Sequence, residues 1–194
     1  MTDPTENNAL VARSLLGWTA KAFAITTLDS IDQESSYKMI DFTAAIKSRH
    51  SAANILLGEN ISIYTTALYA KHKVEIKTYA LPDNETRTAY VVDDTITLST
   101  LTDGTIFSIG CNTRYTGLYR EALSTGMSLG QIKKLTRRQR IFNGSLILDE
   151  DFGFCYLLPS PYDEIADSIE DIPPDLILDE IYISDFSSWL GGPR

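Results

Sequence analysis

Residues 95–109 decide the fold and have the sequence TITLSTLTDGTIFSI. Two runs rich in β-branched residues, 95–101 and 105–109, flank the pair Asp103-Gly104. An Asp-Gly pair tolerates the positive φ angles of a tight hairpin turn and is the strongest short-range hairpin signal. The stretch therefore predicts two antiparallel strands joined by a tight turn.

Further strands are predicted before this hairpin. Residues 61–64 and 74–77 alternate between apolar and polar side chains, which is typical of half-buried strands. Residues 90–92 form a third apolar run, and Pro82-Asp83-Asn84 predicts the turn between the second and third segments.

Two amphipathic segments near the start of the chain predict helices. In residues 9–25 apolar side chains recur every three to four positions, and Asn7 or Asn8 can cap the first turn. In residues 37–49 the spacing places Met39, Phe42 and Ile46 on one face.

The part of the chain after residue 112 mixes both kinds of element. Ser128 and Gln131 have the spacing of a capping box, which predicts a helix through Leu135. Two more short helices are predicted over residues 117–124 and 163–169. Strands are predicted over residues 145–148, 154–158 and 176–183.

The order of helices, strands and then mixed elements predicts an α+β fold, with N-terminal helices packed on a mainly antiparallel sheet. A length of 194 residues fits a single domain over residues 1–194. A subdomain boundary near residue 112 is the alternative.

Charge is distributed unevenly along the chain, whose net charge is −9. Residues 114–140 contain seven basic residues and one acid, whereas residues 149–185 contain twelve acids and no Lys or Arg. The acidic run fits a solubilising surface, a docking surface for a basic partner, or a metal site. The basic run fits a solvated helix face, internal pairing with the acids, or an RNA-contacting patch.

Charge and composition argue against several classes of function. Nucleic-acid binding depends on positive surfaces, so we expect no direct binding of nucleic acid, and anionic lipid is equally disfavoured. No stretch is apolar enough to span a bilayer, and the first residues lack a signal-peptide pattern. Cys111 and Cys155 are too few for a disulfide framework. We expect a cytoplasmic protein with two buried, reduced thiols.

Motifs for catalysis or metal binding are scarce. Asp151-Phe152-Gly153 matches a kinase tripeptide without any other kinase motif, and predicts instead a hairpin turn with Gly153 at a positive φ. His50 and His72 lack zinc-ligand spacing, and no Gly-rich phosphate loop occurs. We predict a protein that is not an enzyme and has no cofactor and no metal.

Aromatic residues accompany the acidic run, at Tyr162, Tyr182, Phe186 and Trp189. Aromatic side chains are enriched at interface hot spots, and acids steer a basic partner. The other interpretation is that Tyr182 faces the core and Trp189 covers an edge.

Three segments follow an order seen in a known class of protein. They are Gly126 to Ile132 (GMSLGQI), the acidic turn over residues 149–153, and Leu178 to Ile183 (LDEIYI). In this order of short helix, acidic turn and closing strand, the chain resembles the small α+β immunity proteins that bacteria encode beside polymorphic toxins. Those toxins are delivered by contact-dependent inhibition or type VI secretion. The N-terminal 110 residues take no part in the resemblance.

The resemblance implies an antitoxin in bacterial competition, which neutralises one cognate toxin by protein–protein interaction. An acidic face suits a basic toxin domain such as a nuclease. The residues expected to bind the partner are Asp149, Glu150, Asp151, Tyr162, Asp163, Glu164, Asp167, Glu170 and Asp171. The alternatives are an acidic nucleic-acid mimic that inhibits a host defence protein, as in phages, and a carboxylate-dependent hydrolase.

Overall fold

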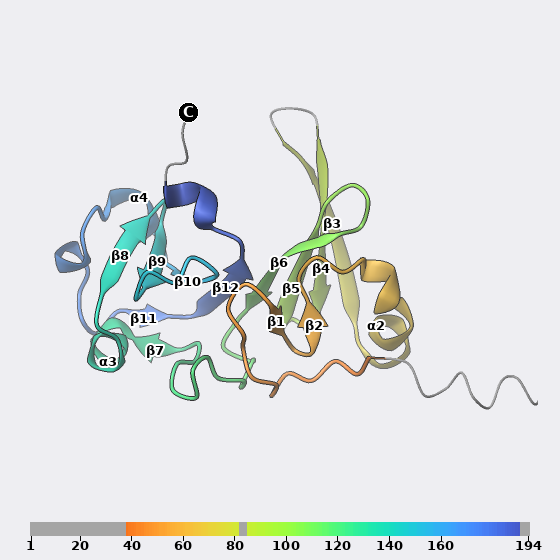
Figure 1. Ribbon diagram of the computed structural model, residues 1–194, viewed down its shortest axis with the longest axis horizontal. Coiled ribbons are helices and arrows are strands. Elements are labelled where there is room, and N and C mark those ends of the chain that lie inside the picture. Colours follow the sequence, from red (N-terminus) through yellow and green to blue (C-terminus); the bar gives the residue numbers. More distant parts are fainter. Residues whose placement is uncertain (1–37, 82–84, 191–194) are drawn as a thin grey trace, which may run out of the picture. The chain divides into compact units, whose positions relative to one another are not determined.

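The computed structural model describes residues 38–81 and 85–190, which belong to one compact unit (Figure 1). The helix predicted over residues 9–25 lies outside the described residues, as does the turn predicted at Pro82-Asp83-Asn84.

One antiparallel sheet of eight strands organises the described residues (Figure 1). In spatial order its strands are β3 (Val74–Ala80), β4 (Thr86–Val92), β5 (Ile96–Thr100), β6 (Ile106–Cys111), β12 (Glu180–Ser184), β10 (Phe154–Leu157), β9 (Ser145–Leu148) and β8 (Gln139–Phe142). Strands β6 and β12 are paired through Ile109 and Ile183, so the sheet continues across residue 112.

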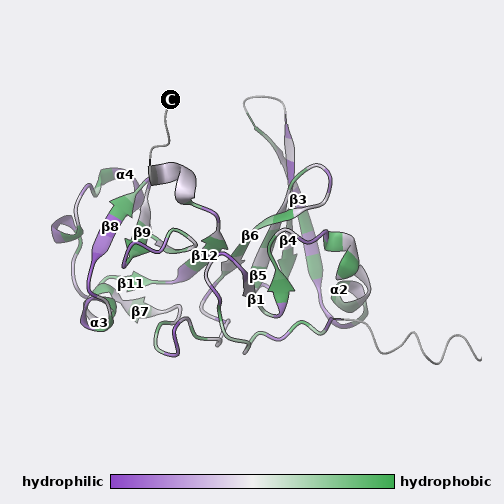
Figure 2. Cartoon of the chain, in the orientation of Figure 1, coloured by the Kyte–Doolittle hydropathy of each residue, from purple (hydrophilic) through white to green (hydrophobic). Residues whose placement is uncertain are grey.

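The main core lies on one face of this sheet. Paired positions across the sheet place Tyr90, Leu98, Ile109, Ile183 and Phe154 in one row, and all but Tyr90 are fully buried. Successive residues of a strand point to opposite faces, so the alternation seen in the sequence becomes one apolar face. In Figure 2, the strands that form this face contain hydrophobic residues, which are drawn in green.

The opposite face of the sheet has a second cluster of buried apolar residues at its far end. There Ile147, Phe152 and Cys155 form a second, smaller core against Phe186 and Trp189. Phe186 and Trp189 are half-buried in this cluster. Trp189 also lies beside Phe142 of the edge strand β8, with ring centroids 6.4 Å apart, in agreement with the interpretation that it covers an edge.

Short helices and two small sheets complete the fold. The helical elements are η1 (Ile61–Ile63), α2 (Thr65–Lys71), α3 (Leu129–Leu135), α4 (Tyr162–Ile165), η2 (Ile169–Asp171) and η3 (Ser187–Leu190). The small sheets pair β1 (Ser51–Ala52) with β2 (Ile55–Leu56), and β7 (Met127–Ser128) with β11 (Ile177–Leu178). The architecture is thus a mainly antiparallel sheet with short helices, compatible with α+β, and its described helices are not N-terminal.

Several local signals are confirmed. Asp103-Gly104 turns the hairpin between β5 and β6, with Gly104 at a φ of +85°. Ser128 accepts from the backbone of Gln131, and the Gln131 side chain accepts from the backbone of Ser128, so the capping box of α3 is complete. The strand predicted over residues 145–148 is β9, and that over 154–158 is β10 within one residue.

The helix predicted over residues 37–49 is wrong. Backbone hydrogen bonds there go to distant segments, from Asp41 N–H to Ala53 O at 3.2 Å and from Ile46 N–H to Leu118 O at 2.9 Å. Met39 is 66% exposed, whereas Ile46 is buried. The regularly spaced apolar residues of this segment therefore have separate environments in the fold and do not form one face of a helix.

Two more predictions of secondary structure are wrong. Residues 61–63 form η1 instead of a strand, because the Asn60 side chain accepts from Ser62 N–H and caps a turn. Residues 117–124 form no helix, because Arg120 and Glu121 have φ angles of 50° and 59°, which lie outside the helical region.

Two predictions near the C-terminus hold in part. The helix predicted over residues 163–169 is divided into α4 and η2. The strand predicted over 176–183 is also divided, since β11 pairs with β7 while β12 lies inside the main sheet.

Gly153 is needed for close packing and not for a positive φ, which corrects our prediction. The positive φ angles of this turn belong to Asp149 and Glu150, at 51° and 60°. A Cβ atom on Gly153 would lie 2.6 Å from the backbone nitrogen of Arg49. Its carbonyl also accepts from Arg49 N–H at 3.0 Å, which holds the 38–54 segment against the turn.

We predict that Gly153→Ala destabilises the protein by about 2–3 kcal/mol, the upper part of the range for overpacking. Gly58→Ala is the matched control, because Gly58 also lies in a turn but has open space around it. The control costs about 1 kcal/mol through its positive φ. Urea unfolding measures both, and an equal or smaller loss for Gly153→Ala than for Gly58→Ala would contradict the packing argument.

Candidate partner-binding surface

The acidic turn, Asp149 to Asp151, is bound internally. Asp151 accepts hydrogen bonds from the hydroxyl groups of Ser48 and Tyr119, and from Gly153 N–H at 2.9 Å. Arg120 adds an ion pair at 3.4 Å. This carboxylate therefore joins three segments that are far apart in the sequence.

The environment of Asp151 favours its ionised form. Burial alone would raise the pKa of this carboxyl, but hydrogen bonds from Ser48 and Tyr119, then Gly153 N–H, and finally the Arg120 charge outweigh it. The pKa of Asp151 therefore lies below its ordinary value. Tyr119 is in turn held by stacking on Phe154, with ring centroids 3.9 Å apart.

Asp149 and Glu150 are paired with the basic run. Asp149 accepts from the backbone N–H groups of Arg137 and Arg138 at 2.8 and 3.0 Å, and pairs with Arg120 at 2.9 Å. Burial would raise the pKa of Asp149, yet these backbone donors and Arg120 hold it below its ordinary value. Glu150 pairs with Arg138 at 2.9 Å and, through its other oxygen, with Arg140.

The basic run thus neutralises the acidic turn, as one of our alternatives proposed. The left-handed backbone at Arg120 aims its guanidinium at two carboxylates at once. Three arginine side chains pair with three acids here, so this part of the expected partner-binding set carries little uncompensated charge. The pairing could not be derived from spacing, because Arg120 and Asp149 are 29 residues apart.

The acidic loop, Tyr162 to Asp171, has a different environment. Tyr162 packs against the main core, and Ala166 and the following Ile172 are buried, so the loop is anchored at three points. Asp163 rests on the turn before β9, since a Cβ on Gly144 would lie 2.8 Å from its carbonyl oxygen. The loop therefore has a defined backbone although its surface is charged.

The acidic residues of the loop are exposed. Glu170 accepts from the Ser168 hydroxyl, and this bond and, more weakly, the charge of Lys133 lower its pKa. Within residues 38–81 and 85–190, no ion pair involves Asp163, Glu164, Asp167, Glu170 or Asp171. The carboxylate of Asp171 instead accepts from Ser168 N–H at 2.9 Å and caps η2. The loop thus holds the uncompensated negative charge of the expected set.

One large apolar side chain is exposed among these carboxylates. Ile165, between Glu164 and Ala166, is 64% exposed. An exposed apolar residue surrounded by charge has the composition of an interface centre with a polar rim. Tyr182, Phe186 and Trp189 do not contribute to this surface, since they pack in the second core.

The structure separates the two halves of the expected site. The acidic loop contacts the turn before β9 at Gly144, whereas the acidic turn follows β9 at Asp149. Five residues of extended strand span about 15 Å. The nine residues therefore form two groups at opposite ends of β9, one paired internally and one open.

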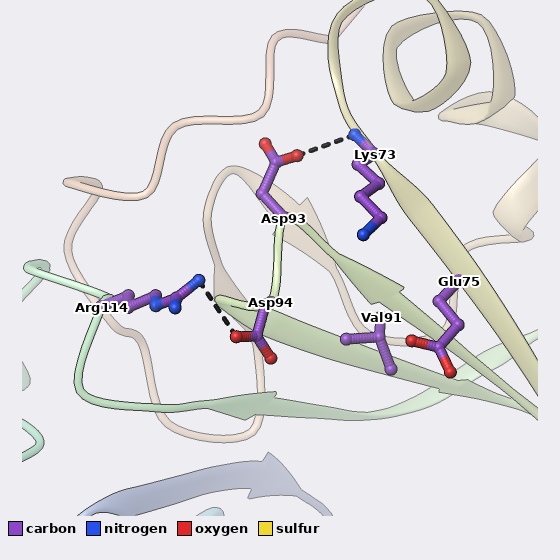
Figure 3. Close-up of a pocket in the computed structure, with 6 residues that line it drawn as sticks. All are labelled: Lys73, Glu75, Val91, Asp93, Asp94 and Arg114. Carbon is purple, nitrogen blue, oxygen red and sulfur yellow. Dashed lines mark hydrogen bonds and ion pairs between the residues drawn. The ribbon is translucent and has the colours of Figure 1, made fainter.

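A polar pocket of about 370 Å³ was not predicted from the sequence (Figure 3). It is lined by Lys73, Glu75, Val91, Asp93, Asp94 and Arg114. Asp93 accepts from Lys73 N–H at 2.7 Å and contacts His72, and Asp94 pairs with Arg114 at 3.0 Å. The pairing of the strands brings these residues together, and no local sequence motif predicts the pocket.

Among the described residues, no group of three or more side chains is placed to hold a metal ion. Cys111 and Cys155 are buried free thiols, and burial raises the pKa of each to about 12. The carboxyl groups with a clear pKa shift are all shifted downward, for example Asp41, Glu59 and Asp151. A carboxylic acid that donates a proton needs the opposite shift.

Comparisons with protein-family models, curated proteins and solved structures gave no match to this chain. No helix within the described residues is both long enough and apolar enough to cross a membrane.

We predict that Asp151→Asn destabilises the protein by about 2 kcal/mol at pH 7, because it removes a charged acceptor of several hydrogen bonds. The pKa of Asp151 is lower in the folded state than in the unfolded chain. Its stabilisation is therefore complete above about pH 5 and is lost as the pH falls through the folded-state pKa.

Urea unfolding between pH 7 and pH 2.5 tests this prediction. The free energy of unfolding should fall less steeply with decreasing pH in Asp151→Asn than in the wild type. Asp163→Asn serves as the control, since this exposed carboxylate has no ion pair, and its effect should stay within about 0.5 kcal/mol. Identical pH profiles for the wild type and Asp151→Asn would refute the role given to this carboxylate.

Proposed function

We propose that the chain is a non-enzymatic inhibitor, an immunity protein that binds and neutralises a basic toxin domain in the cytoplasm. The observation that carries the proposal is the contrast between the acidic turn and the acidic loop. The carboxylates of the turn form ion pairs with arginine side chains of the same chain. The carboxylates of the loop form no ion pair within the described residues, and the backbone of the loop is anchored by packing against the main core. A nuclease is a suitable target, because its substrate cleft is basic.

An acidic surface of this kind favours binding to a basic protein. Unpaired carboxylates of one sign accelerate encounter with an oppositely charged partner and select against acidic ones. Because the loop is anchored by Tyr162, Ala166 and Ile172, binding needs little ordering of the backbone. Exposed Ile165 supplies the apolar contact that charge alone lacks.

The decisive experiment identifies the partner and then tests protection. The tagged full chain is used to capture proteins from its native cells at about 0.15 M salt, and native mass spectrometry gives the stoichiometry. The captured protein is then expressed in a bacterial host with and without this chain. Growth arrest that co-expression relieves supports the proposal, whereas a captured protein that is harmless by itself contradicts it. Capture of a nucleic-acid-binding defence protein would favour the nucleic-acid mimic instead.

We predict that Asp163→Lys/Glu164→Lys slows association with the captured partner at least tenfold, because steering depends on the local field. Asp175→Lys/Asp179→Lys is the matched control: it changes the net charge equally, at exposed positions outside the loop that form no ion pair within the described residues. Stopped-flow or surface-based kinetics at 50 and 300 mM salt measures the rates. If both variants slow association equally, the effect comes from net charge and the loop is not the binding surface.

We also predict that Ile165→Ala weakens binding about tenfold by faster dissociation, while the free energy of unfolding changes by less than about 0.5 kcal/mol. Ile63→Ala is the control, since Ile63 is 46% exposed on η1. Calorimetric titration and urea unfolding give the two quantities. Equal affinities of Ile165→Ala and Ile63→Ala would remove Ile165 from the interface.

A further inference from the structure

Within residues 38–81 and 85–190, the outer edge of β3 is not paired with another strand. Six of its seven residues are exposed, and Ile76, on the core face, is still 51% exposed. Within the described residues, β3 pairs with β4 alone. The other edge strand, β8, has four residues, is half-buried and lies against η2.

Long exposed edges are unusual, because their unpaired backbone groups bind other strands. Natural proteins block such edges with proline, bulges, short strands or unpaired lysine. β3 contains no proline, and its pairing with β4 runs in regular register from Val74 to Ala80. Its Lys77 forms an ion pair with Glu75 of the same strand, with an N–O distance of 3.4 Å, so this lysine is not an unpaired blocking charge. The edge is therefore open to pairing.

The hydrogen bonds at both ends of the β3–β4 pair show which backbone groups point outward. Asp93 N–H donates to Lys73 O, and Leu81 N–H donates to Glu85 O, both at 2.8 Å. In an antiparallel pair, directly hydrogen-bonded residues alternate with non-bonded ones. Odd-numbered residues of β3 thus bond to β4, and the outward groups belong to Val74, Ile76, Thr78 and Ala80.

A second copy of β3 can pair with these groups in several registers, and the register centred on Ile76 matches the charges of Glu75 and Lys77. When Ile76 faces Ile76 of the second copy, Glu75 faces Lys77 and Lys77 faces Glu75 across the two-fold axis. Moving the register by two residues, so that Lys77 faces Lys77, creates a like-charge pair instead. Opposite charges directly across two strands stabilise the pair, whereas like charges destabilise it.

We propose that β3 is a homodimer interface, in which two copies pair antiparallel about Ile76 and join their sheets into one. On the core face, Ile76 meets Ile76 and Val74 meets Thr78. On the other face, two Glu75–Lys77 pairs form in the non-hydrogen-bonded positions, where side chains lie closest. Figure 3 shows Glu75 on β3 and Lys73 just before the strand. A two-fold contact of this kind uses the same patch on both copies and closes after two.

Charge variants of the full chain test the register directly. Glu75→Lys and Lys77→Glu each replace two opposite-charge pairs with two like-charge pairs, so each alone should raise the dimer Kd at least tenfold. An equimolar mixture of the two variants restores both pairs and should form heterodimers. The double variant Glu75→Lys/Lys77→Glu should dimerise like the wild type. Analytical ultracentrifugation from 1 to 200 µM measures all four samples.

Fold damage is separated from interface loss by the mixture, because misfolded chains would not recover on mixing. Ile76→Pro gives a second test: it removes an outward N–H while leaving the bonds to β4 in place. It should be monomeric with an unchanged circular dichroism spectrum. A wild type that is monomeric at 200 µM overturns the proposal, and so does a dimer that neither charge variant weakens.

Discussion

The Asp151 carboxylate is the contact on which the rest of the structure depends. It binds the Ser48 hydroxyl from the first described segment, the Tyr119 hydroxyl and Arg120 from the middle, and Gly153 beside it. These segments contain little regular structure, so side-chain bonds replace the backbone ladder that a helix or strand would provide. The missing Cβ of Gly153 lets the Arg49 backbone approach. These bonds connect the loops to the turn that joins β9 and β10 of the main sheet.

Local signals in the sequence predicted the elements whose bonds are local. The Asp103-Gly104 hairpin and the Ser128 capping box depend on residues within a few positions of each other, and both are present. The segments 37–49 and 117–124 have helical spacing, but their backbone bonds join distant partners, for example Ile46 and Leu118. Tertiary hydrogen bonding overrode propensity in these two segments. Strand β8 was not predicted, although a local signal exists: Asn143-Gly144, with φ angles of 46° and 71°, turns β8 into β9.

For the candidate site as well, the sequence shows which residues are charged but not which of them form ion pairs. The sequence identified the acids at Asp149 to Asp151 and Asp163 to Asp171, since density of charge is visible without a fold. It could not show that Arg120, Arg138 and Arg140 fold back on the first group and leave the second open. The position of the pairs depends on the left-handed turns at Arg120 and Asp149, which are tertiary features. Charge pattern alone therefore overestimates the extent of an acidic surface.

The open carboxylates of the acidic loop have a consequence for how this protein can evolve. Asp163, Glu164 and Asp167 stabilise no ion pair within the described residues, so replacing them costs the fold little. The acidic turn has no such freedom, because each change there leaves an arginine or a hydroxyl without its acceptor. Changes on the loop can therefore alter which partner is recognised at little cost in stability, whereas changes in the turn weaken the framework. The molecule separates the part that tolerates substitution from the part that does not.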